Sequence, residues 1–145
     1  MLAATHLVIG GAVGLAVDRP VPRAAAAVAS HALLDSVDHE DSLGLFAQAA
    51  LASAALGALT VSAGPRSGVV AGALGAALPD LEIALGKLTR RESRYLFPTH
   101  WQLAGRRGEH PWKVTPRRIP LAVEIVATAA VCGLVCAWSR RAGQH

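Results

Sequence analysis

Residues Ser42 to Pro65 read SLGLFAQAALASAALGALTVSAGP, a run without a single charged side chain. A helix needs about 20 apolar residues to cross the hydrocarbon core of a bilayer. This run therefore predicts a transmembrane helix. Three further apolar runs, each interrupted by at most one or two ionisable residues, could also span; they cover residues 1–17, 67–79 and 119–139.

Hydrophobic residues make up 52% of the 145-residue chain, and charged residues only 17%. Turn-forming clusters separate the apolar runs. Together these features predict one all-α domain over residues 1–145, a polytopic membrane bundle of about five helices. The expected helices cover about residues 3–17, 24–39, 44–62, 67–86 and 119–138. A soluble alanine-rich bundle is the competing interpretation, because Ala and Gly are only weakly hydrophobic.

Small residues recur at helical spacing in two of the apolar runs. Gly10 and Gly14 are four positions apart, as are Gly68 and Gly72. Such pairs let helix backbones approach closely in lipid, so we expect tight helix packing at these positions.

The stretch Ser30 to His39, SHALLDSVDH, places two imidazoles and two carboxylates in an expected helix. At about 100° per residue, all four side chains fall within an arc of about 100°. They are His31, Asp35, Asp38 and His39. Nitrogen and oxygen donors on one stripe suit a metal such as zinc. The alternative is a solvated polar face on a surface helix.

If the helices alternate across a membrane, the ionisable residues of the apolar runs collect on one side. Asp80 and Glu82 close the fourth expected helix, and Glu124 lies near the start of the fifth. A charge at the bilayer centre costs at least about 2.5 to 3.5 kcal/mol, so such groups face one another or a bound cation. We therefore predict a divalent metal cofactor, zinc being the best match, with these ligands: His6, His31, Asp35, His39, Asp80 and His100.

One long basic loop is predicted over about residues 87–118, which hold nine of the 14 Lys and Arg residues. Its interleaved aromatic residues are typical of a chain in the headgroup region, where it would bind membrane lipids. A more specific interpretation is that the loop binds a phosphate-bearing amphiphilic substrate through Arg94, Arg106 and Arg107. Nucleic acid is not an expected partner, because one short basic segment is weak support for it.

Four short motifs carry a family resemblance: Thr5-His6, Ser30-His31 followed by Asp35 and His39, Leu78-Pro79-Asp80-Leu81-Glu82, and Thr99-His100. They resemble the YdjM-like membrane-bound metal-dependent hydrolase family of small bacterial membrane proteins, and more widely the all-helical zinc phospholipases and nucleases. The resemblance implies that the first three motifs form the metal-binding set. The chain departs from the pattern, because its Ser-His-x-x-x-Asp helix precedes the Pro-Asp motif and a His-Arg-x-x-Thr-His-Ser segment is missing. It thus resembles a compact, divergent member.

The leading hypothesis is a membrane-embedded metal-dependent hydrolase that acts on a phosphoester of a lipid or related amphiphile. Glu82 is the predicted catalytic base, since a carboxylate that does not bind the metal can take a proton from the attacking water. Two alternatives stay open. The same cluster could transport or sense a cation or a proton, or the polar residues could serve only to hold the helices together.

Arginine outnumbers lysine by 12 to 2 and alanine is abundant, which suggests a GC-rich bacterial genome and the inner (cytoplasmic) membrane. The nine basic residues of the loop lie on the side of the predicted metal cluster. The positive-inside rule therefore places that side in the cytoplasm. Arg19 and Arg23, in the connection between the first two expected helices, favour the opposite orientation.

Overall fold

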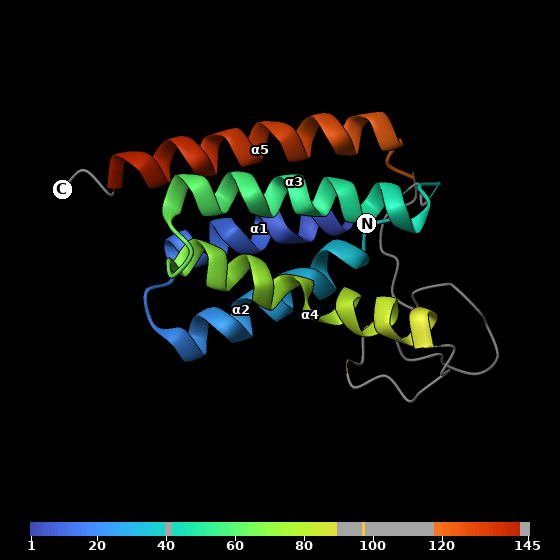
Figure 1. The fold of residues 1–145 in the computed structure, drawn as a ribbon, viewed down its shortest axis with the longest axis horizontal. Coiled ribbons are helices and arrows are strands. Elements are labelled where there is room, and N and C mark those ends of the chain that lie inside the picture. Colours follow the sequence, from blue (N-terminus) through green and yellow to red (C-terminus); the bar gives the residue numbers. More distant parts are fainter. Residues whose placement is uncertain (40–41, 90–96, 98–117, 143–145) are drawn as a thin grey trace.

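The computed structural model describes residues 1–39, 42–89, 97 and 118–142. Five α-helices are present in these residues: α1 (Ala3–Ala16), α2 (Pro20–Asp35), α3 (Leu45–Ala63), α4 (Gly68–Thr89) and α5 (Leu121–Ala142). In Figure 1, α1, α3 and α5 run along the long axis of the molecule, with α2 and α4 below them. The predicted all-α bundle of five helices is confirmed, and most of the predicted basic loop falls outside the described residues.

Three helices are long and apolar enough to cross a membrane: Leu45–Ala63, Gly68–Gly86 and Leu121–Ala142. α1 is apolar but has only 14 residues, about 21 Å of helix against a hydrocarbon core of about 30 Å. It is the enclosed helix of the bundle, since it contacts each of the other four. α1 is therefore shorter than the membrane span that residues 1–17 could have formed, and the other four helices shield it.

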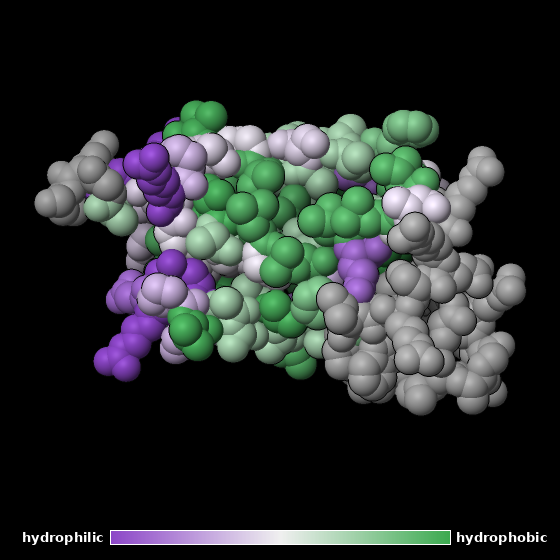
Figure 2. Space-filling view, turned by 60° about the horizontal axis from the view of Figure 1, so that its bottom comes forward, coloured by the Kyte–Doolittle hydropathy of each residue, from purple (hydrophilic) through white to green (hydrophobic). Residues whose placement is uncertain are grey.

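The outer surface of the bundle is apolar. Large side chains on α3, α4 and α5 stay exposed, among them Phe46 at 90%, Val61 at 86% and Leu134 at 71%. Figure 2 shows hydrophobic side chains across the middle of one face and hydrophilic ones at the end of the bundle that Figure 1 marks with the C-terminus. Contiguous apolar surface of this kind is rare on soluble proteins. The arrangement fits a multi-pass membrane protein better than a soluble bundle.

Glycines allow α1 and α4 to touch backbone to backbone. A Cβ atom at Gly10 would lie 2.5 Å from both the Ala76 Cβ and the Gly72 carbonyl oxygen, and a Cβ at Gly68 would lie 2.7 Å from the Gly14 carbonyl oxygen. No larger side chain fits at these distances without moving a helix. The predicted tight packing is confirmed, and it brings the two helices that carry His6 and Asp80 together.

α2 differs from its predicted range of residues 24–39. It begins at Pro20, because proline suits the first turn of a helix, where its missing N–H is not needed. It ends at Asp35: the Val37 amide donates a 3.1 Å bond to the Leu34 carbonyl in a tighter turn, and the Asp38 carbonyl accepts from the distant Ile119 amide instead of continuing the helix. The prediction that Asp38 and His39 share a helical face with Asp35 is therefore wrong.

Beyond α2 the chain turns toward the start of α5. The Ile119 amide donates a 2.8 Å hydrogen bond to the Asp38 carbonyl, and the Asp38 carboxylate lies 3.8 Å from the Arg118 guanidinium. Asp38 thus joins two segments at the surface.

Candidate metal centre

Two histidines from different helices meet in the centre of the bundle. His6 of α1 and His31 of α2 are both fully buried, at 0% exposure. Their rings stack with centroids 3.9 Å apart and planes inclined by 25°. The close contact of α1 with α4 and the contact of α1 with α2 place both rings beside a third helix, α4.

Two carboxylates face the same edge of these rings. Asp35 lies one helical turn after His31, so the two share one face of α2. Its Oδ1 is 3.1 Å from His6 Nε2 and its Oδ2 is 3.0 Å from His31 Nε2. Asp80 of α4 is further away, with Oδ2 3.9 Å from His6 Nε2 and Oδ1 4.0 Å from His31 Nε2. Each Nε2 atom is therefore within 4.0 Å of both carboxylates.

These separations suit a shared cation. The ligand atoms of His6, His31 and Asp80 all lie within 4.8 Å of one another. Ligands of a tetrahedral zinc ion, at bond lengths of about 2.0 to 2.2 Å, are about 3.3 to 3.6 Å apart. The N···O separations of 3.0 to 4.0 Å that involve Asp35 and Asp80 bracket this value. His6, His31 and Asp80 form a donor set that could hold one metal ion, and the Asp35 carboxylate lies within 3.0 to 3.1 Å of both imidazoles.

The backbone of α4 orients His31. Nδ1 of His31 lies 2.9 Å from the Ala76 carbonyl oxygen, which can only accept, so Nδ1 carries a proton and donates it. In neutral His31, Nε2 then carries the lone pair that a metal requires. Pro79 lies three residues further along α4, where its ring disturbs the preceding helical turn. The ring removes the helical partner of the Gly75 carbonyl, and the neighbouring Ala76 carbonyl is the one that His31 contacts.

His6 and Asp80 have unsatisfied polar atoms. Within the described residues, neither ring nitrogen of His6 nor Oδ2 of Asp80 makes a hydrogen bond. His6 Nε2 lies 3.1 Å from Asp35 Oδ1, at ion-pair distance. Nitrogen and oxygen atoms that bind one metal ion also lie this close together without a hydrogen bond between them. A buried polar atom without a partner costs about 1 to 3 kcal/mol, and a cation bound to His6 Nε2 and Asp80 Oδ2 would remove this cost for those two atoms.

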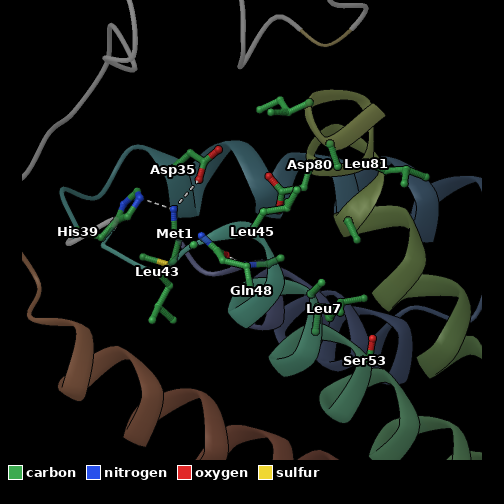
Figure 3. Close-up of a pocket in the computed structure, with 17 residues that line it drawn as sticks. Met1, Leu7, Asp35, His39, Leu43, Leu45, Gln48, Ser53, Asp80 and Leu81 are labelled. Carbon is green, nitrogen blue, oxygen red and sulfur yellow. Dashed lines mark hydrogen bonds and ion pairs between the residues drawn. The ribbon is translucent and has the colours of Figure 1, made fainter. Parts of the chain in front are cut away.

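His39, another predicted ligand, lies at the edge of the cluster. Its Nδ1 donates to the Val37 carbonyl at 2.9 Å, and its Nε2 contacts the amino nitrogen of Met1. That nitrogen is also 3.4 Å from Asp35 Oδ1, so these contacts connect His39 to Asp35 through Met1 (Figure 3). The predicted ligand His100 and the predicted phosphate-binding residues Arg94, Arg106 and Arg107 lie outside the described residues.

Glu82, the predicted base, is two residues after Asp80 in a continuous helix. The two side chains therefore leave α4 about 160° apart. Oε2 of Glu82 accepts a 3.2 Å hydrogen bond from the Phe97 amide. These contacts do not bring Glu82 to the histidines, and its role as a base stays a prediction.

A second group of polar contacts, which the sequence did not predict, positions His6. Glu124 of α5 is buried, and its Oε1 accepts hydrogen bonds from the Leu2 amide at 2.6 Å and the Thr5 hydroxyl at 2.8 Å. The amide of Ala3 donates to Gln48 of α3 at 3.1 Å. Side chains of two other helices thus satisfy the first amides of α1, which otherwise lack partners. The signal in the sequence was a single charged residue, Glu124, in the apolar run 119–139.

A cavity of about 680 Å³ opens beside the cluster. Its polar lining includes Asp35, His39 and Asp80, while Leu7 and small side chains of α3 and α4 line much of the remainder. In Figure 3, Asp35 and His39 lie at one end of the labelled group, and Leu7 and Ser53 lie at the other. The cavity gives a small molecule with one polar and one apolar part a route to the carboxylates.

Comparisons with protein-family models, curated proteins and solved structures find no match to this chain. Its class is therefore defined by its own geometry: an all-α bundle with three candidate membrane spans and a buried His6, His31 and Asp80 group that could hold a metal ion.

Proposed function

We propose that this protein is a membrane-embedded metal-dependent hydrolase that cleaves a phosphoester of a lipid or a related amphiphile. The observation that carries the proposal is the buried set of two imidazoles and two carboxylates, from three helices, at the polar end of an open cavity. The motif resemblance to the YdjM-like hydrolases points to the same activity.

The proposed ligands are His6, His31, Asp35 and Asp80. Zinc is the proposed metal, because mixed nitrogen and carboxylate donors suit it. The metal would supply Lewis-acid polarisation of a phosphoryl oxygen. Around it, the Ala76 carbonyl keeps the His31 proton on Nδ1, and the Asp35 oxygens lie 3.0 to 3.1 Å from the two Nε2 atoms. In the reaction, water attacks phosphorus, the ester P–O bond breaks, and the leaving alcohol takes the proton.

The cavity favours hydrolysis over a cation relay. A relay needs only a narrow path between polar groups, whereas a cavity of about 680 Å³ with apolar walls accommodates a much larger molecule. Arg94, Arg106 and Arg107 are proposed to bind the substrate phosphate, and Glu82 to act as the base. We place the protein in a bacterial inner membrane with the site on the cytoplasmic side, following the positive-inside rule.

The first experiment measures metal by elemental analysis of the detergent-purified protein. We expect stoichiometric metal in the wild type and strong loss in His31→Ala and Asp35→Ala. Asp38→Ala is the matched control, since Asp38 is an acid near Asp35 that contacts Arg118. A wild type without bound metal, or unchanged metal in both site variants, would refute the metal centre.

The second experiment measures turnover of phospholipids in mixed micelles by the zinc-loaded protein. We expect release of a phosphate-containing product from the wild type and from Asp38→Ala, and none from Asp35→Ala. Metal-dependent proton or cation flux in vesicles without any lipid cleavage would replace hydrolysis by transport.

A further inference from the structure

We infer that the cavity between α3 and α4 holds one hydrocarbon chain of a membrane lipid while the anionic phosphate headgroup of that lipid sits at the metal centre. This inference rests on the proposed function and specifies its substrate as a lipid that enters from within the bilayer. It concerns the apolar part of the cavity, which lies away from the proposed metal ligands.

One wall of the cavity is a face of α3. Leu45, Ala49 and Ser53 line it at intervals of four residues, so their side chains stack on one side of the helix. They extend over about 12 Å of helix axis. Ala49 and Ser53 are small and exposed, and α3 therefore presents a smooth and accessible surface at this position.

The opposite wall belongs to α4. Ala77, Leu81 and Ala84 line it at intervals of four and three residues, and Asp80, which also lines the cavity, lies between Ala77 and Leu81 in the sequence. Leu45 and Leu81 are 51% and 53% exposed, which places one exposed leucine on each wall. Leu7 of the enclosed helix α1 also lines the cavity. The groove thus joins an apolar, outward-facing cleft to the carboxylate of the metal centre.

Both walls belong to candidate membrane spans, so in a bilayer the opening would face lipid. Lipid tails are as apolar as the wall of the groove, and a chain that moves between them gains little hydrophobic free energy. Affinity must then come from the headgroup. A divalent cation between two aspartates would attract a phosphate, and the groove lets the attached chain remain in hydrocarbon while the phosphate reaches it.

A second cavity, of about 440 Å³ between α1, α3 and α5, gives an internal comparison. It is more apolar than the groove between α3 and α4, but the described residues that line it include no histidine and no acid, and their charged member is Arg140. Only the groove between α3 and α4, of these two, combines an apolar wall with metal-binding side chains. The combination specifies an amphiphile with an anionic head.

The test uses phosphatidylglycerol with a spin label on its acyl chain, added in trace amount to phosphatidylcholine bilayers that contain the zinc-loaded protein. The motionally restricted fraction of the label measures chain binding, and elemental analysis of the same samples measures zinc. Ala49→Phe and Ser53→Phe fill the groove. Ala50→Phe is the control, because Ala50 is the exposed neighbour of Ala49 and lines neither cavity.

We expect Ala49→Phe and Ser53→Phe to weaken chain binding by about tenfold or more, equivalent to about 1.4 kcal/mol. Ala50→Phe should bind as the wild type does, with equal zinc in all proteins. If zinc is present and the groove-filling variants bind the chain as well as Ala50→Phe does, the groove inference is overturned and the metal centre stands. If no protein binds zinc, the proposed function fails and the inference fails with it.

Discussion

Gly10→Ala adds one methyl group at the contact between α1 and α4. The new Cβ would lie 2.5 Å from both the Ala76 Cβ and the Gly72 carbonyl oxygen, whereas an ordinary contact begins near 3.4 Å. The helices must therefore separate locally by up to 0.9 Å. Overpacking of this kind costs about 1 to 3 kcal/mol of unfolding free energy, which corresponds to a fall of about 2 to 12 °C in Tm.

The same substitution tests the connection between helix packing and the metal centre. Ala76 carries the carbonyl that accepts the His31 hydrogen bond, so a shift of Ala76 loosens the orientation of that imidazole. Loss of such a supporting contact typically reduces metal affinity by about 10- to 100-fold. We therefore expect Gly10→Ala to bind zinc at least about tenfold more weakly than the wild type, following the lower end of that range.

Thermal unfolding in detergent and zinc titration of the apoprotein measure the two effects. Gly133→Ala is the control, because a Cβ at Gly133 of α5 would meet nothing within 4 Å. We expect this variant to be unchanged or slightly more stable, since alanine favours helix by up to about 1 kcal/mol over glycine. If Gly10→Ala has the same Tm and the same zinc affinity as the wild type, both the close contact between α1 and α4 and its effect on His31 are refuted.

Three further perturbations separate the roles of the acidic residues and the metal. Asp80→Asn should lose zinc while Glu82→Gln keeps it, because only Asp80 faces the histidines; elemental analysis of the pair decides, and zinc loss in Glu82→Gln would make Glu82 a ligand. Glu124→Leu should lower the unfolding free energy by about 1 to 3 kcal/mol, since it leaves the Leu2 amide unpaired, whereas Glu124→Gln keeps an acceptor and should cost less; equal losses in a denaturation series would contradict this. Zinc at about 1,000 times its Kd should add about 4 kcal/mol of stability, seen as a rise in Tm that EDTA reverses and that His6→Ala lacks; an identical rise in His6→Ala would show that zinc binds elsewhere.

Much of the fold could be predicted from the spacing of residues within single helices. The glycine pairs Gly10–Gly14 and Gly68–Gly72 predicted close packing correctly, because residues four apart lie on one helical face whatever the tertiary structure. The end of α2 was missed, since beyond Asp35 the chain bonds to a distant segment through Asp38 and Ile119, and the apolar pattern alone does not reveal such a contact.

The candidate site was predictable in part for the same reason. The pair His31 and Asp35 is local and was read from its spacing, and the side of the bundle on which His6 and Asp80 join them followed from counting helices. Contacts between distant segments were not readable. The Glu124 bonds to the start of α1 depend on how five helices pack, and periodicity describes one helix at a time.

The enclosure of α1 has a consequence for the order in which the molecule is assembled. α1 leaves the ribosome before every helix that surrounds it, and its most extensive partner, α4, is synthesised more than 50 residues later. His6 and Asp80 can meet only after that delay. Until the later spans have entered the membrane, the glycines of α1 therefore lack the helix against which they pack. A metal held by these residues would be captured only once α4 has docked, and this step can precede the insertion of α5.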